Sequence, residues 1–205
     1  MPSRDPRRIM IVGVGPHATR FYLPALAATR PEFGVSVVAA VELEGQGERT
    51  RAALAVDGHA AAQVFEVPAF EGRLPTATAA RLDEACADLG IGSVVVATEP
   101  MAHLGYALWA IDRGHALLLD KPISTRRDVA HDLDAARGIA SDFEMLATAY
   151  RRATTASLTI VSICAHRRFH PGIQEILRLV VDTCGGTGCP VTSIHCHHSD
   201  GQWRF

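Results

Sequence analysis

A short glycine-containing segment near the start of the chain has the residue types and spacing that suit binding of a pyrophosphate. It reads G-V-G-P-H-A, and it lies between an apolar run and a predicted helix. In such a G-x-G-x-x-A turn, the first glycine permits a tight turn, the second lets a pyrophosphate approach the backbone, and the alanine lets the helix pack closely on the sheet. We therefore expect a dinucleotide to contact this turn, at Gly13, Gly15, Pro16, His17 and Ala18.

An acidic residue follows the next apolar run, which the sequence predicts to be a strand over residues 35–41. The carboxylate of Glu42 would accept hydrogen bonds from the hydroxyls of the adenine ribose and would repel a 2′-phosphate, which favours NAD over NADP. NADP is not excluded, because Glu44 is a competing acid and because Arg49 or Arg51 would offset the repulsion.

Two later segments follow predicted strands, at the edge where an open parallel sheet binds its ligands. The first reads A-T-E-P over residues 97–100, with His103 shortly after it. The second reads D-K-P over residues 120–122 and directly follows the apolar run 116–119. A lysine at this edge can share a proton with an alcohol, so Lys121 is the candidate catalytic residue.

Together, these segments resemble the motifs of the Gfo/Idh/MocA oxidoreductases, the family named for glucose-fructose oxidoreductase, inositol dehydrogenase and MocA. Members carry a G-x-G-x-x-[GA] turn, an A-T-x-P…H segment, an E-K-P motif and an R-R-F-x-P stretch. Here these stand in the same order at residues 13–18, 97–103, 120–122 and 167–171, so the resemblance covers nearly the whole chain from Arg8 onward. It implies an NAD(P)-dependent oxidoreductase that transfers a hydride to or from a sugar, a cyclic polyol or a related hydroxy compound.

The resemblance also implies roles for single residues around the nicotinamide. Lys121 would contact the nicotinamide ribose and the substrate hydroxyl. Pro122, directly after it, would fix the direction in which the chain leaves the site. Asp120 stands where the family more often has Glu, and its side chain is one methylene shorter.

Further cofactor contacts are implied on either side of the lysine. Thr98 and Pro100 would line the nicotinamide ribose, while His103 would cap the following helix or touch the cofactor. Arg168 would reach the cofactor from the domain junction, with a surface salt bridge as its alternative role. His166 stands where many relatives have Asn, which weakens the transfer of any role to that position.

Alternating strands and helices predict the fold class, an α/β doubly wound parallel sheet of the Rossmann type. We expect an NAD(P)-binding Rossmann domain over residues 8–165, followed over 166–205 by the domain junction and the beginning of a truncated α+β substrate or oligomerisation domain. The expected strands are 8–13, 35–41, 63–67, 93–97, 116–119, 158–164 and 191–197, and the expected helices are 17–29, 48–55, 78–89, 101–113, 125–137, 142–152 and 172–182.

The G-x-H-x-x-D-like motif of the family's second domain has no counterpart in this sequence. In the family, its His and Asp transfer protons and position the substrate, so we expect a chain that is incomplete as an enzyme. A non-catalytic dinucleotide-binding sensor or interaction module is the alternative, and a different Rossmann class, such as a methyltransferase, is a third. Relatives pair through the second-domain sheet, which leaves a homo-oligomer open.

Composition and charge bear on whether the chain binds nucleic acid, membranes or metal ions, and on its cellular compartment. The formal net charge is −2, and the arginine pairs are scattered, so nothing favours binding to nucleic acid or to a membrane surface. The 5 cysteines have no disulfide-framework spacing, which predicts a cytoplasmic protein. Cys184, Cys189 and the H-C-H-H run over 195–198 could suggest zinc. Neighbouring residues of a strand point in opposite directions, however, so no metal site is predicted.

Overall fold

The computed structural model describes residues 5–156, 159–164 and 171–193. The chain divides into two compact units, Met1–Cys164 and Ala165–Phe205. The first unit contains the sheet and its covering helices, and the second contains one helix, α6 (Pro171–Thr187). All predicted site residues except Arg168 belong to the first unit, so the elements of that unit position them.

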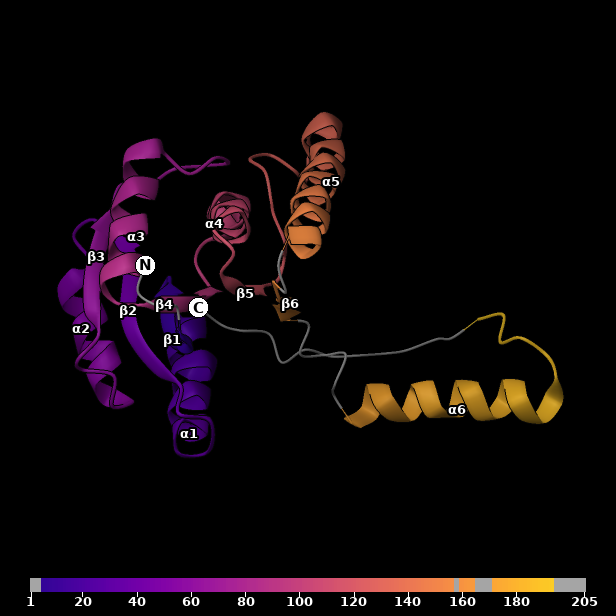
Figure 1. The fold of residues 1–205 in the computed structure, drawn as a ribbon. Helices are drawn as coiled ribbons and strands as arrows, with labels where there is room; N and C mark the ends of the chain where they lie inside the picture. Colours follow the sequence, from indigo (N-terminus) through magenta and orange to yellow (C-terminus); the bar gives the residue numbers. More distant parts are fainter. Residues whose placement is uncertain (1–4, 157–158, 165–170, 194–205) are drawn as a thin grey trace. The chain divides into compact units, whose positions relative to one another are not determined.

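The sheet of the first unit has 6 parallel strands in the order β3-β2-β1-β4-β5-β6, which confirms the predicted Rossmann fold (Figure 1). The strand order reverses between β1 and β4, and a ligand crevice forms beyond the carboxyl ends of the strands at such a point. The strands are β1 (Asp5–Val12), β2 (Ser36–Leu43), β3 (Gln63–Val67), β4 (Ile91–Val96), β5 (Ala116–Asp120) and β6 (Val161–Cys164).

Helices cover both faces of this sheet. The helical elements are the short π-helical turn η1 (Ala18–Tyr22), α1 (Leu23–Phe33), α2 (Gly47–Val56), α3 (Thr76–Asp88), α4 (Pro100–Asp112) and α5 (Leu133–Ala156). Residues of α3, α4 and α5 share one buried cluster with Met10 and Val12, whereas residues of η1, α1 and α2 share another with Ile9 and Ile11. The unbroken apolar run of β1 therefore buries alternate side chains on opposite faces, which is why it does not alternate in polarity.

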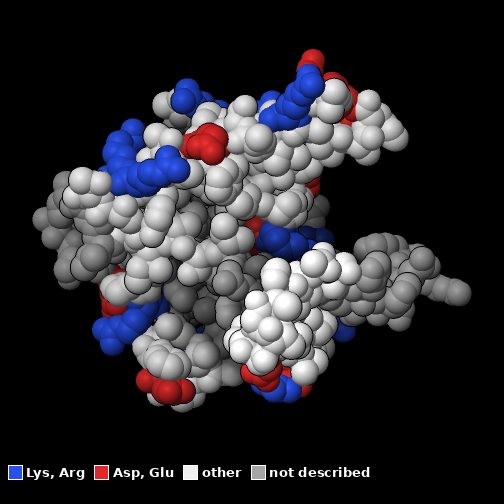
Figure 2. All heavy atoms as spheres, turned by 90° about the vertical axis from the view of Figure 1, so that its right-hand side faces the viewer, with Lys and Arg blue, Asp and Glu red and all other residues white. Residues whose placement is uncertain are grey.

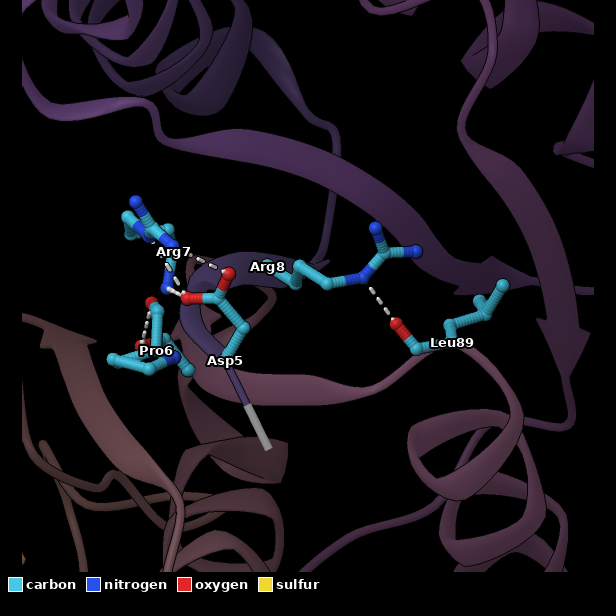
Figure 3. Close-up of polar contacts among 6 residues, drawn as sticks. Asp5, Pro6, Arg7, Arg8 and Leu89 are labelled. Carbon is cyan, nitrogen blue, oxygen red and sulfur yellow. Dashed lines mark hydrogen bonds and ion pairs between the residues drawn. The ribbon is translucent and has the colours of Figure 1, made fainter. Parts of the chain in front are cut away.

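The amino end of β1 is tied to the connection between α3 and β4 (Figure 3). The guanidinium of Arg8 donates a hydrogen bond to the carbonyl oxygen of Leu89, while Arg7 forms an ion pair with Asp5 inside the strand. These contacts lie at the edge opposite the glycine turn. They help to fix the position from which the turn emerges.

Two helix boundaries differ from the sequence prediction. The helix expected over 125–137 begins only at Leu133, and α5 then runs without a break through the helix expected at 142–152. Asp128 has a positive φ of 59°, which interrupts helical backbone, and the carboxylate of Asp132 caps α5 by accepting the N–H of Asp134 over 2.8 Å. Local periodicity continued across this turn and therefore did not reveal it.

The first helix begins where expected, with helical backbone from residue 16 onward, but it ends later than the range 17–29. It opens with η1, and α1 then continues to Phe33, where Gly34 ends it with a left-handed φ of 67°. Pro24 lies in α1 directly after the π-helical turn η1, and helical backbone continues across the proline without a late start.

The second unit is described by itself. Its helix α6 confirms the helix expected over 172–182, and it exposes the apolar side chains of Ile173, Leu177, Leu179 and Val181. Residues 191–193 are not in a strand, and the rest of the strand expected over 191–197 lies outside the described residues.

Among the residues described, no helix is long and apolar enough to cross a bilayer. The same residues contain no group of three or more His, Cys, Asp or Glu side chains arranged to hold a metal ion. Figure 2 shows acidic and basic side chains in small separate groups on the face that it presents.

A buried carboxylate anchors the loop that follows the lysine motif. Asp142 of α5 is 3% exposed and accepts hydrogen bonds from the Ser124 hydroxyl (2.8 Å) and from Nε of Arg126 (3.1 Å). The hydrogen bond from Arg126, and then that from Ser124, lower the pKa of this carboxyl below its ordinary value despite burial. The loop after β5 is therefore tied to α5 by charge-assisted hydrogen bonds.

We predict that Asp142→Asn lowers the free energy of unfolding at neutral pH by about 1–2 kcal/mol, because Arg126 is partly exposed and its attraction is screened. A carboxyl with a lowered folded-state pKa stabilises the fold fully above its unfolded pKa of about 3.9, and loses that contribution as the pH falls through the folded value. Urea unfolding of both proteins across this range should therefore show their difference shrinking in acid. A difference independent of pH would contradict the assignment, and the exposed Asp134→Asn variant is the control.

Candidate functional site

The glycine turn leaves β1 in a conformation and packing that only glycine allows. Gly13 has a φ of 85°, and its N–H donates to the carbonyl of Val41 over 2.9 Å. A Cβ at Gly13 would lie 2.5 Å from Cα of Thr98, well inside van der Waals contact. The turn after β1 therefore packs directly against the first residues after β4.

Gly15 differs from Gly13 because space is open around it. Apart from its neighbours in the chain, none of the described residues has a heavy atom within 4 Å of the position that a Cβ at Gly15 would occupy. Its carbonyl accepts the N–H of Thr19 over 3.0 Å, and Ala18 is fully buried beneath the turn. The backbone at Gly15 is thus held by the start of the helix on one side and is accessible on the side where a Cβ would stand. This arrangement admits a phosphate group.

Glu42 lies at the end of β2 and faces the glycine turn rather than open solvent. It is 9% exposed, and its carboxylate accepts the N–H of Val14 (2.9 Å) and the N–H of Leu43 (3.0 Å). The guanidinium of Arg49 lies 3.8 Å from the same carboxylate, whereas the competing acid Glu44 is exposed. The structure therefore places Glu42, and not Glu44, beside the turn.

The motif after β5 lies at the same edge of the sheet. Asp120 is 8% exposed, and its carboxylate accepts the N–H of Lys121 over 2.8 Å. Its other oxygen lies 3.5 Å from Nε2 of His17, which belongs to the glycine turn. Lys121 itself is exposed, and the peptide bond to Pro122 is cis. One side-chain contact, between Asp120 and His17, thus joins the two motifs.

His103 lies beneath the site. It is 1% exposed, and its ring nitrogens face two carbonyl oxygens, with Nδ1 2.7 Å from that of Pro122 and Nε2 2.9 Å from that of Thr98. His103 lies inside α4, which begins at Pro100. It therefore does not cap the helix, which was one of its two expected roles. Pro100 opens α4, and Thr98 is half-buried.

Tyr22 is a site residue that the motifs did not reveal. Its ring lies 5.6 Å from that of His17, and its hydroxyl is buried without a hydrogen-bond partner among the described residues. Burial, and then the neighbouring Cys164 and Asp120, raise the pKa of Tyr22 above its ordinary value. The only signal in the sequence for this environment is that Tyr22 lies one helical turn beyond the glycine motif.

The remaining sequence predictions fall elsewhere. Arg168 and His166 lie outside the described residues. A cavity of about 910 Å³ lies between α3, α4 and α5, and none of the predicted cofactor contacts lines it. The candidate site is therefore the open edge beyond β1, β2, β4 and β5, and not that cavity.

The chain matches the model of an oxidoreductase family with an NAD-binding Rossmann fold over residues 7–140. No curated protein matches it. A dehydrogenase from Chromobacterium violaceum is similar in structure, with 17% sequence identity, a TM-score of 0.60, and coverage of 87% of this chain and 41% of that one. The WlbA dehydrogenase from Bordetella pertussis, solved with NADH and UDP-GlcNAcA, has 16% identity and a TM-score of 0.58, with coverage of 86% of this chain and 42% of that one. GenD2 from gentamicin A biosynthesis, solved with NAD, has 21% identity and a TM-score of 0.59, with coverage of 89% of this chain and 40% of that one.

This chain spans about two fifths of the length of those solved chains. At such identities the structural likeness reflects a shared fold. The family model, by contrast, covers well over half of the 205 residues and includes three of the four motifs. The chain therefore belongs to the Gfo/Idh/MocA family of oxidoreductases, whose members have an NAD-binding Rossmann fold.

Proposed function

We propose that this chain binds NAD along the open edge of the sheet and serves hydride transfer to or from a sugar, a cyclic polyol or a related hydroxy compound. The observation that carries the proposal is the pairing of two glycines with different surroundings. Gly13 is closed by Thr98, whereas Gly15 has open space where a Cβ would stand. A turn that needed glycine only for its own packing would not leave the second position open.

The polar groups around Gly15 support one orientation of the dinucleotide. The pyrophosphate lies on the backbone at Gly15, and the adenine ribose lies toward Glu42, which is held beside the turn by the N–H of Val14. Negative charge at Glu42 repels a 2′-phosphate, so NAD is preferred. Arg49 lies 3.8 Å from that carboxylate and partly offsets the repulsion.

The nicotinamide half then extends toward the segments after β4 and β5. Thr98, Pro100 and Pro122 line its ribose, and Lys121 contacts both the ribose and the substrate hydroxyl. The bound nicotinamide would supply the acceptor or donor of the hydride. Lys121 orients the substrate hydroxyl, takes its proton as the amine when the alcohol is oxidised, and returns the proton as the ammonium when the carbonyl is reduced. Its exposed position leaves it free to meet a substrate.

The substrate class rests on the family resemblance. The Bordetella protein was solved with a nucleotide-linked sugar acid, but its 16% identity leaves the substrate of this chain to experiment. We assign residues 8–165 to the cofactor domain and 166–205 to the junction and the beginning of the second domain. Turnover of a sugar or polyol would rule out the alternative function, a non-catalytic dinucleotide-binding module, whereas saturable NADH binding alone fits both functions.

We predict that Gly15→Ala weakens NADH binding at least about tenfold, equivalent to about 1.4 kcal/mol, and leaves the melting temperature unchanged. The added Cβ meets no protein atom but occupies the approach of the pyrophosphate. Titration followed by nicotinamide fluorescence, with a melting curve for each protein, measures both effects. Gly13→Ala is the matched control and should lower the melting temperature, because its Cβ would clash with Thr98. Unchanged NADH affinity in Gly15→Ala would refute the assigned turn.

We predict that Glu42→Gln lowers the preference for NADH over NADPH by about tenfold. The amide oxygen can still accept the N–H of Val14, whereas the amide nitrogen cannot accept that of Leu43, so the change removes the negative charge together with one of the two hydrogen bonds. Competition of each cofactor against the other reports the ratio of affinities. Glu44→Gln, at an exposed neighbour, should leave the ratio as in the wild type. A change in the Glu44 variant, with none in the Glu42 variant, would reverse the assignment.

A further inference from the structure

His103 occupies a buried position between the two segments assigned to the nicotinamide half. It lies in α4, is 1% exposed, and places one ring nitrogen near each segment. Nδ1 lies 2.7 Å from the carbonyl oxygen of Pro122, and Nε2 lies 2.9 Å from that of Thr98. Its ring is thus enclosed by protein, and both nitrogens are directed at backbone rather than at the space of a ligand.

The chemistry of these two contacts makes the ring a donor. A carbonyl oxygen only accepts, so the ring donates an N–H, and its tautomer decides which of the two oxygens receives that hydrogen bond. The ring is planar and rigid, so its two nitrogens hold a fixed separation. The distance between the two carbonyl groups is therefore set by the side chain that joins them.

Each carbonyl belongs to a segment with a further contact in the site. Thr98 is the residue that Gly13 packs against, at 2.5 Å from the position of a Cβ. Pro122 directly follows Lys121, whose N–H is held by Asp120 over 2.8 Å. A continuous series of contacts therefore runs from the glycine turn through Thr98 and His103 to the segment that carries the lysine.

We propose that His103 is a positioning residue that sets the spacing between the pyrophosphate turn and Lys121, and that it does not itself touch the cofactor. This proposal rests on the proposed function, because it assumes that the glycine turn binds the pyrophosphate of the dinucleotide and that the segment with Lys121 meets its nicotinamide half. It replaces the cofactor contact that the motif alone offered for His103. The rigid side chain acts through the backbone of two loops.

Hydrogen exchange followed by mass spectrometry tests the positioning directly and needs no cofactor. In His103→Phe, amides at 97–99 and at 120–124 should exchange at least about tenfold faster, while those at the carboxyl end of α4 stay unchanged. In His103→Asn, the amide nitrogen stands near the place of Nδ1 and should restore protection at 120–124 alone. In His103→Gln, it stands near the place of Nε2 and should restore protection at 97–99 alone.

These two conservative variants keep the test decisive if the Phe variant does not fold. Protection restored at both loops by either amide, or at neither loop by both, would overturn the proposal. Wild-type exchange at both loops in His103→Phe would do the same. A general loss of protection across α4 and the sheet in every variant would show a merely structural role.

A second measurement connects the spacing to the ligand. The affinity for NADH is compared with that for ADP, which carries the pyrophosphate but lacks the nicotinamide and its ribose. A positioning role of His103 predicts that His103→Phe lowers the affinity for NADH about tenfold, while ADP binds as in the wild type. Equal losses for both ligands would overturn it. If the wild type binds neither ligand, the proposed function fails, and the exchange pattern still decides whether His103 sets the loop spacing.

Discussion

The contact between the backbone of Gly13 and that of Thr98 is the constraint on which the site depends. The turn after β1 and the segment after β4 approach so closely that a single Cβ would lie 2.5 Å from a neighbouring Cα. Packing at this density leaves no room for a side chain at Gly13, so any larger residue there would displace one of the two loops. The strand order reverses at this point, and the close contact therefore fixes the floor of the crevice that the fold opens there.

Polar side chains complete the edge by binding backbone groups of neighbouring loops. Glu42 accepts the N–H of Val14, Asp120 accepts the N–H of Lys121, and His103 joins two carbonyl groups. Hydrogen bonds to charged groups are stronger than those between neutral groups, and partial burial strengthens them further because the local dielectric constant is lower than that of water. The acids at this edge thus have two uses, because they position the loops and also set the charge that a ligand meets.

The sequence predicted the parts of this structure that local patterns determine. The strand over 63–67 and the apolar run before Asp120 lie where expected, because buried parallel strands leave unbroken apolar runs between turn residues. The glycine motif predicted the difference in surroundings between Gly13 and Gly15. Its chemistry is backbone chemistry, which the residue types report directly.

Other features depend on tertiary contacts that residue spacing does not encode. The delayed start of α5 follows from the backbone at Asp128, and the burial of His103 follows from two loops that are distant in sequence. Tyr22 gained its environment from Asp120 and Cys164, at the ends of other strands. These residues were missed or assigned a different role because their neighbours come from elsewhere in the sheet.

The central claim is that one dinucleotide extends from the turn at Gly15 to the segment at Lys121. Amide NMR spectra of the ¹⁵N-labelled chain, recorded during a titration with NADH, test it most directly. We expect the amide signals of Gly15 and Lys121 to shift together with one dissociation constant, while that of Gly34, at the far end of α1, stays unchanged. A shift at Gly15 without one at Lys121, or at neither, would contradict the account.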